Sequence, residues 1–210
     1  RPIVLTVPED DTIGGDTDAD GSRSAPAVGD RNSIIIHGGG TKESALEHVE
    51  LRYGGVSVNG GGKATAEHTE VRFGGVSFTL SEHFNAAFLA NGGQLTVKNS
   101  LVQTANNIGL AVLAGGLLAA ENVLLANSTF ANVFGNDAGS QVTLTNNTLD
   151  GGDYGVALDN NAHLVRLVNN IISHHALAGV ALMHGGAAGT EIRANDVYNP
   201  GATFGNYANM

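Results

Sequence analysis

The chain of 210 residues contains no cysteine and no tryptophan, and only 14% of its residues are charged. Without cysteine it forms no disulfide and carries out no thiol chemistry. Its four prolines lie at positions 2, 8, 26 and 200, so a long central stretch has none. Because proline would remove a backbone donor from a strand ladder, this central stretch suits continuous β-structure.

Long apolar runs and positive charge are also scarce. The longest apolar stretch, residues 108–120, is interrupted by glycines and is shorter than the roughly 18 residues of a membrane-spanning helix. Ten basic and twenty acidic residues give a net charge of -10, which repels phosphate backbones and anionic membrane surfaces. We therefore expect neither nucleic-acid binding nor membrane insertion. The start at Arg1-Pro2, without a signal peptide, predicts a processed protein or a fragment.

Glycine is abundant, with 30 residues, and the chain repeats itself. Residues 47–57 and 67–77 share the pattern Glu-His-x-Glu-x-Arg-aromatic-Gly-Gly-Val-Ser. A repeat over so short a period predicts a stack of equivalent coils that share one core.

Later segments continue the repeat at a spacing of about 23 residues. Each contains a short strand with alternating apolar residues, followed by a polar residue at a bend. Asparagine suits such a bend because it tolerates left-handed backbone angles, and stacked amides can hydrogen-bond along the axis. The predicted bend column contains His48, His68, Asn99, Asn122, Asn146 and Asn169.

The strand pattern predicts an all-β fold, a single-stranded right-handed parallel β-helix (solenoid) with three short strands per coil. About seven coils fit between residues 33 and 199, giving a rod on the order of 35 Å long. Residues 75–78 are assigned to the same strand series as residues 55–58, and residues 79–85 are interpreted as an insertion that lengthens one turn. The predicted organisation is an N-terminal strand and acidic loop packed on the solenoid (residues 1–32) and one continuous β-helix (residues 33–210).

Three segments carry a resemblance to known proteins: residues 10–17 (DDTIGGDT), residues 25–30 (APAVGD) and residues 46–55. Together they resemble the right-handed parallel β-helix repeats of large secreted and surface-attached bacterial proteins, structural relatives of the pectate lyase superfamily. Relatives often carry a tryptophan where this chain has Arg31-Asn32. The resemblance implies a noncatalytic repeat within a longer polypeptide, although the superfamily also contains polysaccharide lyases and hydrolases, so the fold leaves function open.

The acidic segment is the sharpest candidate for a site. Residues 16–21 match the first half of a calcium loop, in which alternate carboxylates converge and a glycine permits the sharp turn. The twelfth position holds Ala27 instead of glutamate, so the ion needs further ligands from the acidic residues nearby, including Glu9 and Asp30. We expect calcium as a structural cofactor; the alternative is a solvated acidic turn. The predicted metal ligands are Asp10, Asp11, Asp16, Asp18 and Asp20.

The repeated histidines allow two interpretations. His48 and His68 could share a metal ion with Glu47 and Glu67, or with His37 and His83. Alternatively, they could simply replace asparagine in the bend column. We favour the bend column, because the repeat alone explains the neighbouring glutamates. The adjacent pair at residues 174–175, together with His163 and His184, is expected to contact solvent.

Catalysis is not expected from the outward faces of the strands. Glu50, Arg52 and their repeats at 70 and 72 are typical surface ion pairs, although such a patch could also hold an acidic sugar. A lyase needs a base and a cation near the substrate carboxylate, and a glycosidase needs two carboxylates roughly 5 to 10 Å apart. The row expected to face outward contains no ionisable side chain. It contains Ser57, Ser77, Ala111, Phe134, Ala157 and Ala181.

These observations favour a noncatalytic extracellular or cell-surface β-helix module, a rigid structural or adhesive segment with a calcium-ordered loop. A polysaccharide-active enzyme of the pectate-lyase type, or a fragment of one, is the second hypothesis. A self-assembling surface or filament subunit is the third, because no capping helix is apparent at either end. The expected partners are flanking coils or domains of a longer polypeptide, a second copy of the chain, or a polysaccharide.

Overall fold

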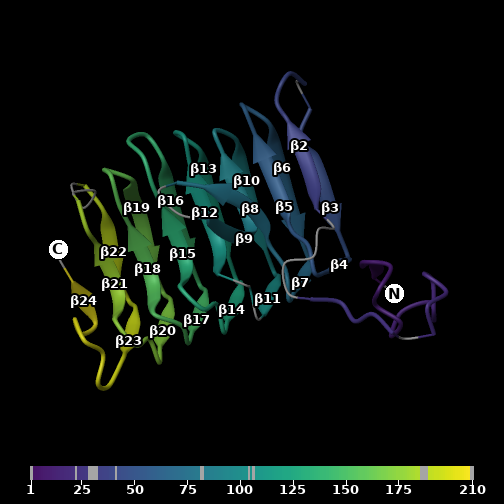
Figure 1. Ribbon diagram of the computed structural model, residues 1–210. Coiled ribbons are helices and arrows are strands. Elements are labelled where there is room, and N and C mark those ends of the chain that lie inside the picture. The colour runs from purple at the N-terminus through teal and green to yellow at the C-terminus, as the bar shows by residue number, and fades with distance from the viewer. Residues whose placement is uncertain are drawn as a thin grey trace.

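The computed structural model describes residues 2–21, 23–27, 33–40, 42–80, 83–103, 105, 107–184 and 189–208. Three β-sheets run along the axis of a rod, and successive coils follow one another from the N-terminal to the C-terminal end (Figure 1). The pairing between successive coils is parallel, as in Leu95 against Leu118. The predicted all-β parallel solenoid, with about seven coils and three strands per coil, is confirmed.

Each sheet takes one strand from each coil. Sheet A consists of β1 (Ile3–Leu5), β4 (Val49–Arg52), β7 (Glu70–Arg72), β11 (Leu101–Gln103), β14 (Leu124–Ala126), β17 (Thr148–Asp150), β20 (Ile171–Ser173) and β23 (Asp196–Tyr198). Sheet B consists of β2 (Ile34–His37), β5 (Val56–Asn59), β9 (His83–Asn91), β12 (Ile108–Leu113), β15 (Ala131–Gly135), β18 (Tyr154–Leu158), β21 (Ala178–Leu182) and β24 (Tyr207–Ala208), with β8 (Val76–Thr79) attached to β9. Sheet C consists of β3 (Ser44–Glu47), β6 (Lys63–Glu67), β10 (Gln94–Lys98), β13 (Leu117–Glu121), β16 (Gln141–Thr145), β19 (His163–Val168) and β22 (Glu191–Arg193).

The core fills the space between the three sheets. Alternate residues point inward from each strand, as Leu95 and Val97 do in β10, and both are buried. Phe88 in β9 is the largest of the fully buried side chains. Small inward residues such as Ala64 and Ala66 fill the same positions one coil earlier, so the core varies in size while the strand register stays constant.

The predicted bend column lies between sheets C and A and is confirmed. All six residues have a left-handed backbone, with φ of 54° (His48), 49° (His68), 47° (Asn99), 54° (Asn122), 59° (Asn146) and 56° (Asn169). The imidazoles of His48 and His68 stack with their centroids 5.0 Å apart. Asn122 Nδ2 donates to Asn99 Oδ1 at 2.8 Å, so the side chains follow one another along the axis as expected.

A second column, which the sequence did not reveal as separate, lies directly inside the first. Asn147 and Asn170 are buried, and their amides hydrogen-bond to backbone groups of neighbouring coils. Asn147 Oδ1 accepts from the Val123 amide at 2.9 Å, and Asn170 Oδ1 accepts from the Asn147 amide at 2.9 Å. These side chains satisfy backbone groups that the bend removes from the sheet ladders.

The assignment of residues 75–78 to the same parallel strand series as residues 55–58 is wrong. β8 turns back as a hairpin on the outer side of the rod and pairs antiparallel with the first part of β9. The second part of the nine-residue β9 enters the sheet, where Phe88 pairs with Val56. The physical reason is burial, since Phe88 fills the core whereas Val76 and Phe78 alternate with exposed residues at the surface.

The hairpin covers a second apolar cluster outside the rod. Phe84 lies 5.7 Å from Phe130 and 6.0 Å from Phe134, measured between ring centroids. Leu89 and Ala111, which face outward from sheet B, are buried in this cluster. Sheet B is therefore apolar on both faces where the hairpin lies.

One histidine expected to contact solvent is buried. His175 is 2% exposed, and its Nε2 lies 3.3 Å from the Leu149 carbonyl oxygen. Burial lowers the pKa of His175, although hydrogen bonds to the backbone act in the opposite direction. The adjacent His174 is exposed and bonds to Asp150 through Nδ1 at 2.6 Å. Two adjacent residues of a turn thus face apart, as predicted, but one of them enters the rod.

Among the residues that the structure describes, no helix has the length and apolarity needed to cross a membrane.

Candidate functional site

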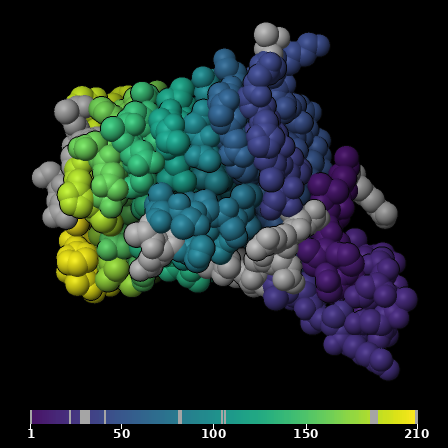
Figure 2. Space-filling view, turned by 45° about the horizontal axis from the view of Figure 1, so that its top comes forward, coloured from purple at the N-terminus to yellow at the C-terminus, as the bar shows by residue number. Residues whose placement is uncertain are grey.

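The N-terminal segment joins the rod through β1. Its residues pair in parallel with β4, from Ile3 against Val49 to Leu5 against Leu51, so β1 forms the edge of sheet A. Val7 is buried after the strand ends. The acidic residues that follow bulge from this end of the molecule (Figure 2).

Asp10 fixes the segment to the first complete coil. Its carboxylate is 1% exposed and accepts hydrogen bonds from the hydroxyls of Thr6, at 2.6 Å, and Thr12. Arg52 lies 3.7 Å from the same carboxylate and also donates to Thr12 Oγ1 at 3.0 Å. Burial acts to raise the pKa of Asp10, but the hydrogen bonds from Thr12 and Thr6, together with the charge of Arg52, outweigh it and lower the pKa. Asp10 is thus engaged in anchoring the segment.

Of the five predicted metal ligands, the structure brings three together. Carboxylate oxygens of Asp11, Asp16 and Asp18 lie within 4.8 Å of one another. This group includes neither Asp10 nor Asp20, and it does not include Glu9; Asp30 lies outside the described residues.

Hydrogen bonds within the turn orient two of these carboxylates, those of Asp16 and Asp18. Asp16 accepts from the amides of Asp20 and Gly21, each at 3.0 Å. Asp18 accepts from Ser24 Oγ at 2.9 Å. Asp20 accepts from the amides of two residues that follow it, Arg23 at 2.8 Å and Ser24 at 2.6 Å. Oxygen ligands in a short turn suit a hard cation such as calcium, and the same hydrogen bonds also describe an acidic turn in solvent.

The repeated glutamates and arginines form pairs on the outer face of sheet A. Arg52 Nε donates to Glu50 Oε1 at 2.7 Å, and Arg72 pairs with Glu70 in the next coil. Glu50 pairs with Glu70 in the strand register, and Arg52 with Arg72. Each arginine is thus neutralised within its own strand, as expected of surface ion pairs.

The outward row of sheet B differs from the predicted row at one position. Leu89, not Ser77, stacks between Ser57 and Ala111. Ser77 lies in the hairpin, where its hydroxyl donates to Asn85 Oδ1 at 2.7 Å. The row therefore carries apolar residues that the hairpin buries, and sequence periodicity could not reveal this because the covering strand is out of the repeat.

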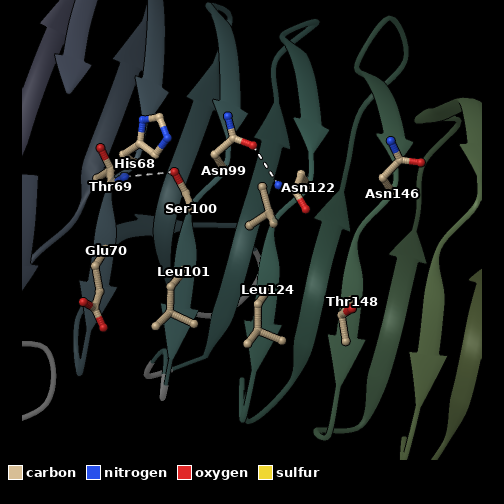
Figure 3. Close-up of a pocket in the computed structure, with 11 residues that line it drawn as sticks. His68, Thr69, Glu70, Asn99, Ser100, Leu101, Asn122, Leu124, Asn146 and Thr148 are labelled. Atoms are coloured by element: carbon tan, nitrogen blue, oxygen red, sulfur yellow. Dashed lines mark hydrogen bonds between the residues drawn. The ribbon is translucent and has the colours of Figure 1, made fainter. Parts of the chain in front are cut away.

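A groove follows the bend between sheets C and A (Figure 3). It has a volume of about 730 Å³ and runs across four coils, from Glu70 in β7 to Thr148 in β17. The exposed bend residues form one side and outward residues of sheet A form the other. A smaller groove of about 450 Å³, lined by Pro2 and His48 among others, shares His68 and Glu70 with it and continues toward β1. The repeat pattern alone gave no indication of this groove, although the bend column marks its course.

Residues 29–206 match the family model described as the right handed beta helix region. The match covers nearly all of the coils. The chain belongs to the right-handed β-helix family. The predicted right-handed β-helix is thereby confirmed, and its kinship with the pectate-lyase-like superfamily is consistent with this match. Comparison with curated proteins and comparison with solved structures both returned no match.

Acid is expected to release the N-terminal segment of this β-helix. The lowered pKa of Asp10 means that its contribution to stability is present above the unfolded value of about 3.9 and is lost as pH falls through the lower folded value. Asp10→Asn should cost about 2 kcal/mol at pH 7, because hydrogen bonds to a charged group are lost. The protection of residues 3–12 against hydrogen exchange, relative to the intrinsic rate at each pH, should fall below about pH 4 in the native chain. In the variant it should be weak at pH 7 as well as below pH 4. Equal protection in the two proteins at pH 7 would contradict the anchoring role of Asp10.

Proposed function

We propose that this β-helix is a noncatalytic module of an extracellular or cell-surface protein, where it acts as a rigid structural or adhesive segment. The observation that carries the proposal is the outward row of sheet B. Side chains there, such as Leu89, Ala111 and Phe134, are apolar and buried under the hairpin. On sheet A the arginines are paired with glutamates of the same strand. These faces are built for stability rather than for positioning a base and an acid on a substrate.

Activity assays test this proposal against a polysaccharide-active enzyme. Incubation with a panel of polyuronates, followed by absorbance of unsaturated products, measures lyase activity. Release of reducing ends from neutral polysaccharides measures hydrolysis. We expect neither signal above that of a heat-denatured sample. Turnover that rises with protein concentration would overturn the noncatalytic assignment.

We further propose that calcium orders the acidic loop through Asp11, Asp16 and Asp18. Saturating calcium, at about 100 times the dissociation constant, contributes about 2.7 kcal/mol. For a chain of this size that corresponds to a rise in melting temperature of roughly 5 °C or more. Calorimetry with calcium and with a chelator measures the shift, and limited proteolysis within residues 11–21 should be suppressed by the ion.

Matched variants locate the calcium effect. The double variant Asp16→Asn/Asp18→Asn should abolish both the thermal shift and the protection. Asp196→Asn removes an exposed carboxylate at the far end of sheet A and should leave both unchanged. If calcium produces neither a shift nor protection in the native chain, the loop is a solvated acidic turn.

A further inference from the structure

The bend column changes its chemistry between its second and third members. Its first two residues are His48 and His68, and asparagine takes the same position in the next four coils with the same left-handed backbone. Figure 3 shows His68 in line with Asn99 of the following coil. Because asparagine adopts this backbone readily, the bend alone does not require an imidazole. The two histidines therefore offer a chemistry that the bend does not use.

The two imidazoles form an exposed pair without hydrogen-bond partners. Their centroids lie 5.0 Å apart, and their planes differ by 14°. Among the residues that the structure describes, no hydrogen bond or ion pair involves either ring. His174 and His184, in contrast, are each bonded to an aspartate. A neutral imidazole without such a partner offers one nitrogen lone pair to a metal ion.

Two carboxylates accompany the pair on the side of sheet C. Glu47 and Glu67, which directly precede the histidines, are opposite each other in the register of β3 and β6. Glu67 Oε1 accepts from Asn99 Nδ2 at 2.9 Å, so this carboxylate reaches the bend column one coil ahead of its own. The same reach one coil earlier brings the exposed Glu47 to His68.

The small groove on the side of sheet A gives access to the pair. It has a volume of about 450 Å³, and both histidines line it together with Glu50 and Glu70. These two glutamates are paired with Arg52 and Arg72, and Lys98, which follows Glu67 in sheet C, is paired with Glu121. Four carboxylates and two guanidinium groups therefore surround the imidazoles, and this surplus of negative charge attracts a cation.

The donor atoms select the kind of cation. Calcium and magnesium prefer oxygen ligands alone, whereas imidazole nitrogen combined with carboxylate oxygen suits zinc and similar divalent transition metals. Zinc–nitrogen bonds are about 2.0–2.1 Å long, so two rings that share an ion bring their nitrogens to within about 4.2 Å of each other. A tilt of the two exposed rings toward each other achieves this from the observed spacing. His37 and His83 belong to strands of sheet B and do not accompany the pair.

We propose that His48 and His68, together with Glu47 and Glu67, bind one divalent transition-metal ion of the zinc type. The ion joins the first two complete coils on the outside of the rod. This site is separate from the acidic loop, whose donors are all carboxylate oxygens. It is also independent of the noncatalytic function proposed above.

Calorimetric titration of the full chain with zinc tests the proposal, with calcium in excess so that the acidic loop does not compete. We expect a single zinc ion per chain. The ring-proton NMR signals of His48 and His68 should shift on addition of zinc, whereas those of His174 should not. Magnesium in place of zinc should give neither effect.

His68→Asn is the decisive variant, because it installs the residue that the column itself uses in the next coil. The bend is retained while one metal ligand is lost. Binding should weaken by roughly 100-fold, since even the loss of a group that only orients a ligand costs about 10- to 100-fold. Glu67→Gln keeps an oxygen that accepts from Asn99 and should weaken binding roughly tenfold.

Two matched controls should leave the zinc affinity unchanged. Glu121→Gln removes a carboxylate from the same outward row of sheet C, where the bend residue that follows is Asn122 instead of histidine. His184→Asn removes an exposed histidine that is bonded to Asp159. Circular dichroism and the melting temperature without zinc confirm that each variant folds.

Three outcomes overturn the inference: no binding of zinc, undiminished binding by the His68→Asn variant, or an equal loss of affinity in His184→Asn. The calcium proposal is tested separately, because the Asp16→Asn/Asp18→Asn variant should bind zinc as the native chain does. His68→Asn should in turn retain the calcium-dependent thermal shift.

Discussion

Replacing Phe88 by alanine is expected to lower the free energy of unfolding by about 3 to 5 kcal/mol. Phe88 is fully buried in the coil that carries the hairpin, between Val56 of β5 and Leu110 of β12. Its removal leaves a cavity that the paired backbones on both sides cannot close, because the strand ladders fix their spacing. Urea unfolding followed by circular dichroism measures the shift of the midpoint.

Phe84, four residues earlier in β9, is the matched control for Phe88. It is partly exposed and packs against Phe78 and Phe130 in the outer cluster. Phe84→Ala should cost about 1 to 2 kcal/mol and should make residues 76–85 more sensitive to protease while the rod stays folded. A larger loss of stability from Phe84→Ala than from Phe88→Ala would mean that the outer cluster, rather than the space between the sheets, is the dominant core.

Asn170→Ala is expected to destabilise the rod by about 3 kcal/mol. Asn170 is 1% exposed, and its Nδ2 donates to the carbonyls of Leu144, at 3.2 Å, and Val168, at 3.1 Å. Its Oδ1 accepts from the Asn147 amide. Alanine would leave these buried backbone groups without partners, and an unsatisfied buried group costs about 1 to 3 kcal/mol.

The neighbouring asparagine again provides the control. Asn169 is exposed and left-handed, so Asn169→Ala loses one surface hydrogen bond and adds backbone strain of about 1 kcal/mol. The difference between the two variants in chemical denaturation isolates the contribution of the interior column. Equal midpoints would contradict the role assigned to Asn170.

The sequence predicted the coils because each coil obeys local rules. Alternating apolar residues define the strands, and the histidines and asparagines of the bend share one backbone conformation that few residue types adopt. The interior column escaped notice because Asn147 and Asn170 follow other asparagines directly. In each pair of adjacent asparagines only the second side chain points into the rod, and the sequence does not show which one does.

The errors arose where distant segments decide the structure. Residues 75–78 repeat the pattern of residues 55–58, yet Phe88 takes the position in sheet B because it fills the core better. His175 is buried through contacts with Leu149 and Asn199 of adjacent coils. In the acidic loop, composition suggested five ligands, but hydrogen bonds with Thr6 and Thr12 direct Asp10 elsewhere. Asx-type turns similarly engage Asp20.

The hairpin also affects how folding propagates from one coil to the next. Most rungs close over about 23 residues, as between Leu110 and Val133, whereas Val56 and Phe88 are 32 positions apart. The entropy of closing a loop grows only with the logarithm of its length, so the longer excursion costs about 0.3 kcal/mol. The hairpin therefore hardly opposes the propagation of folding from the coil of Val56 to that of Phe88. A turn that accepts nine extra residues so cheaply is a natural position for inserting or exchanging whole segments without disturbing the rod.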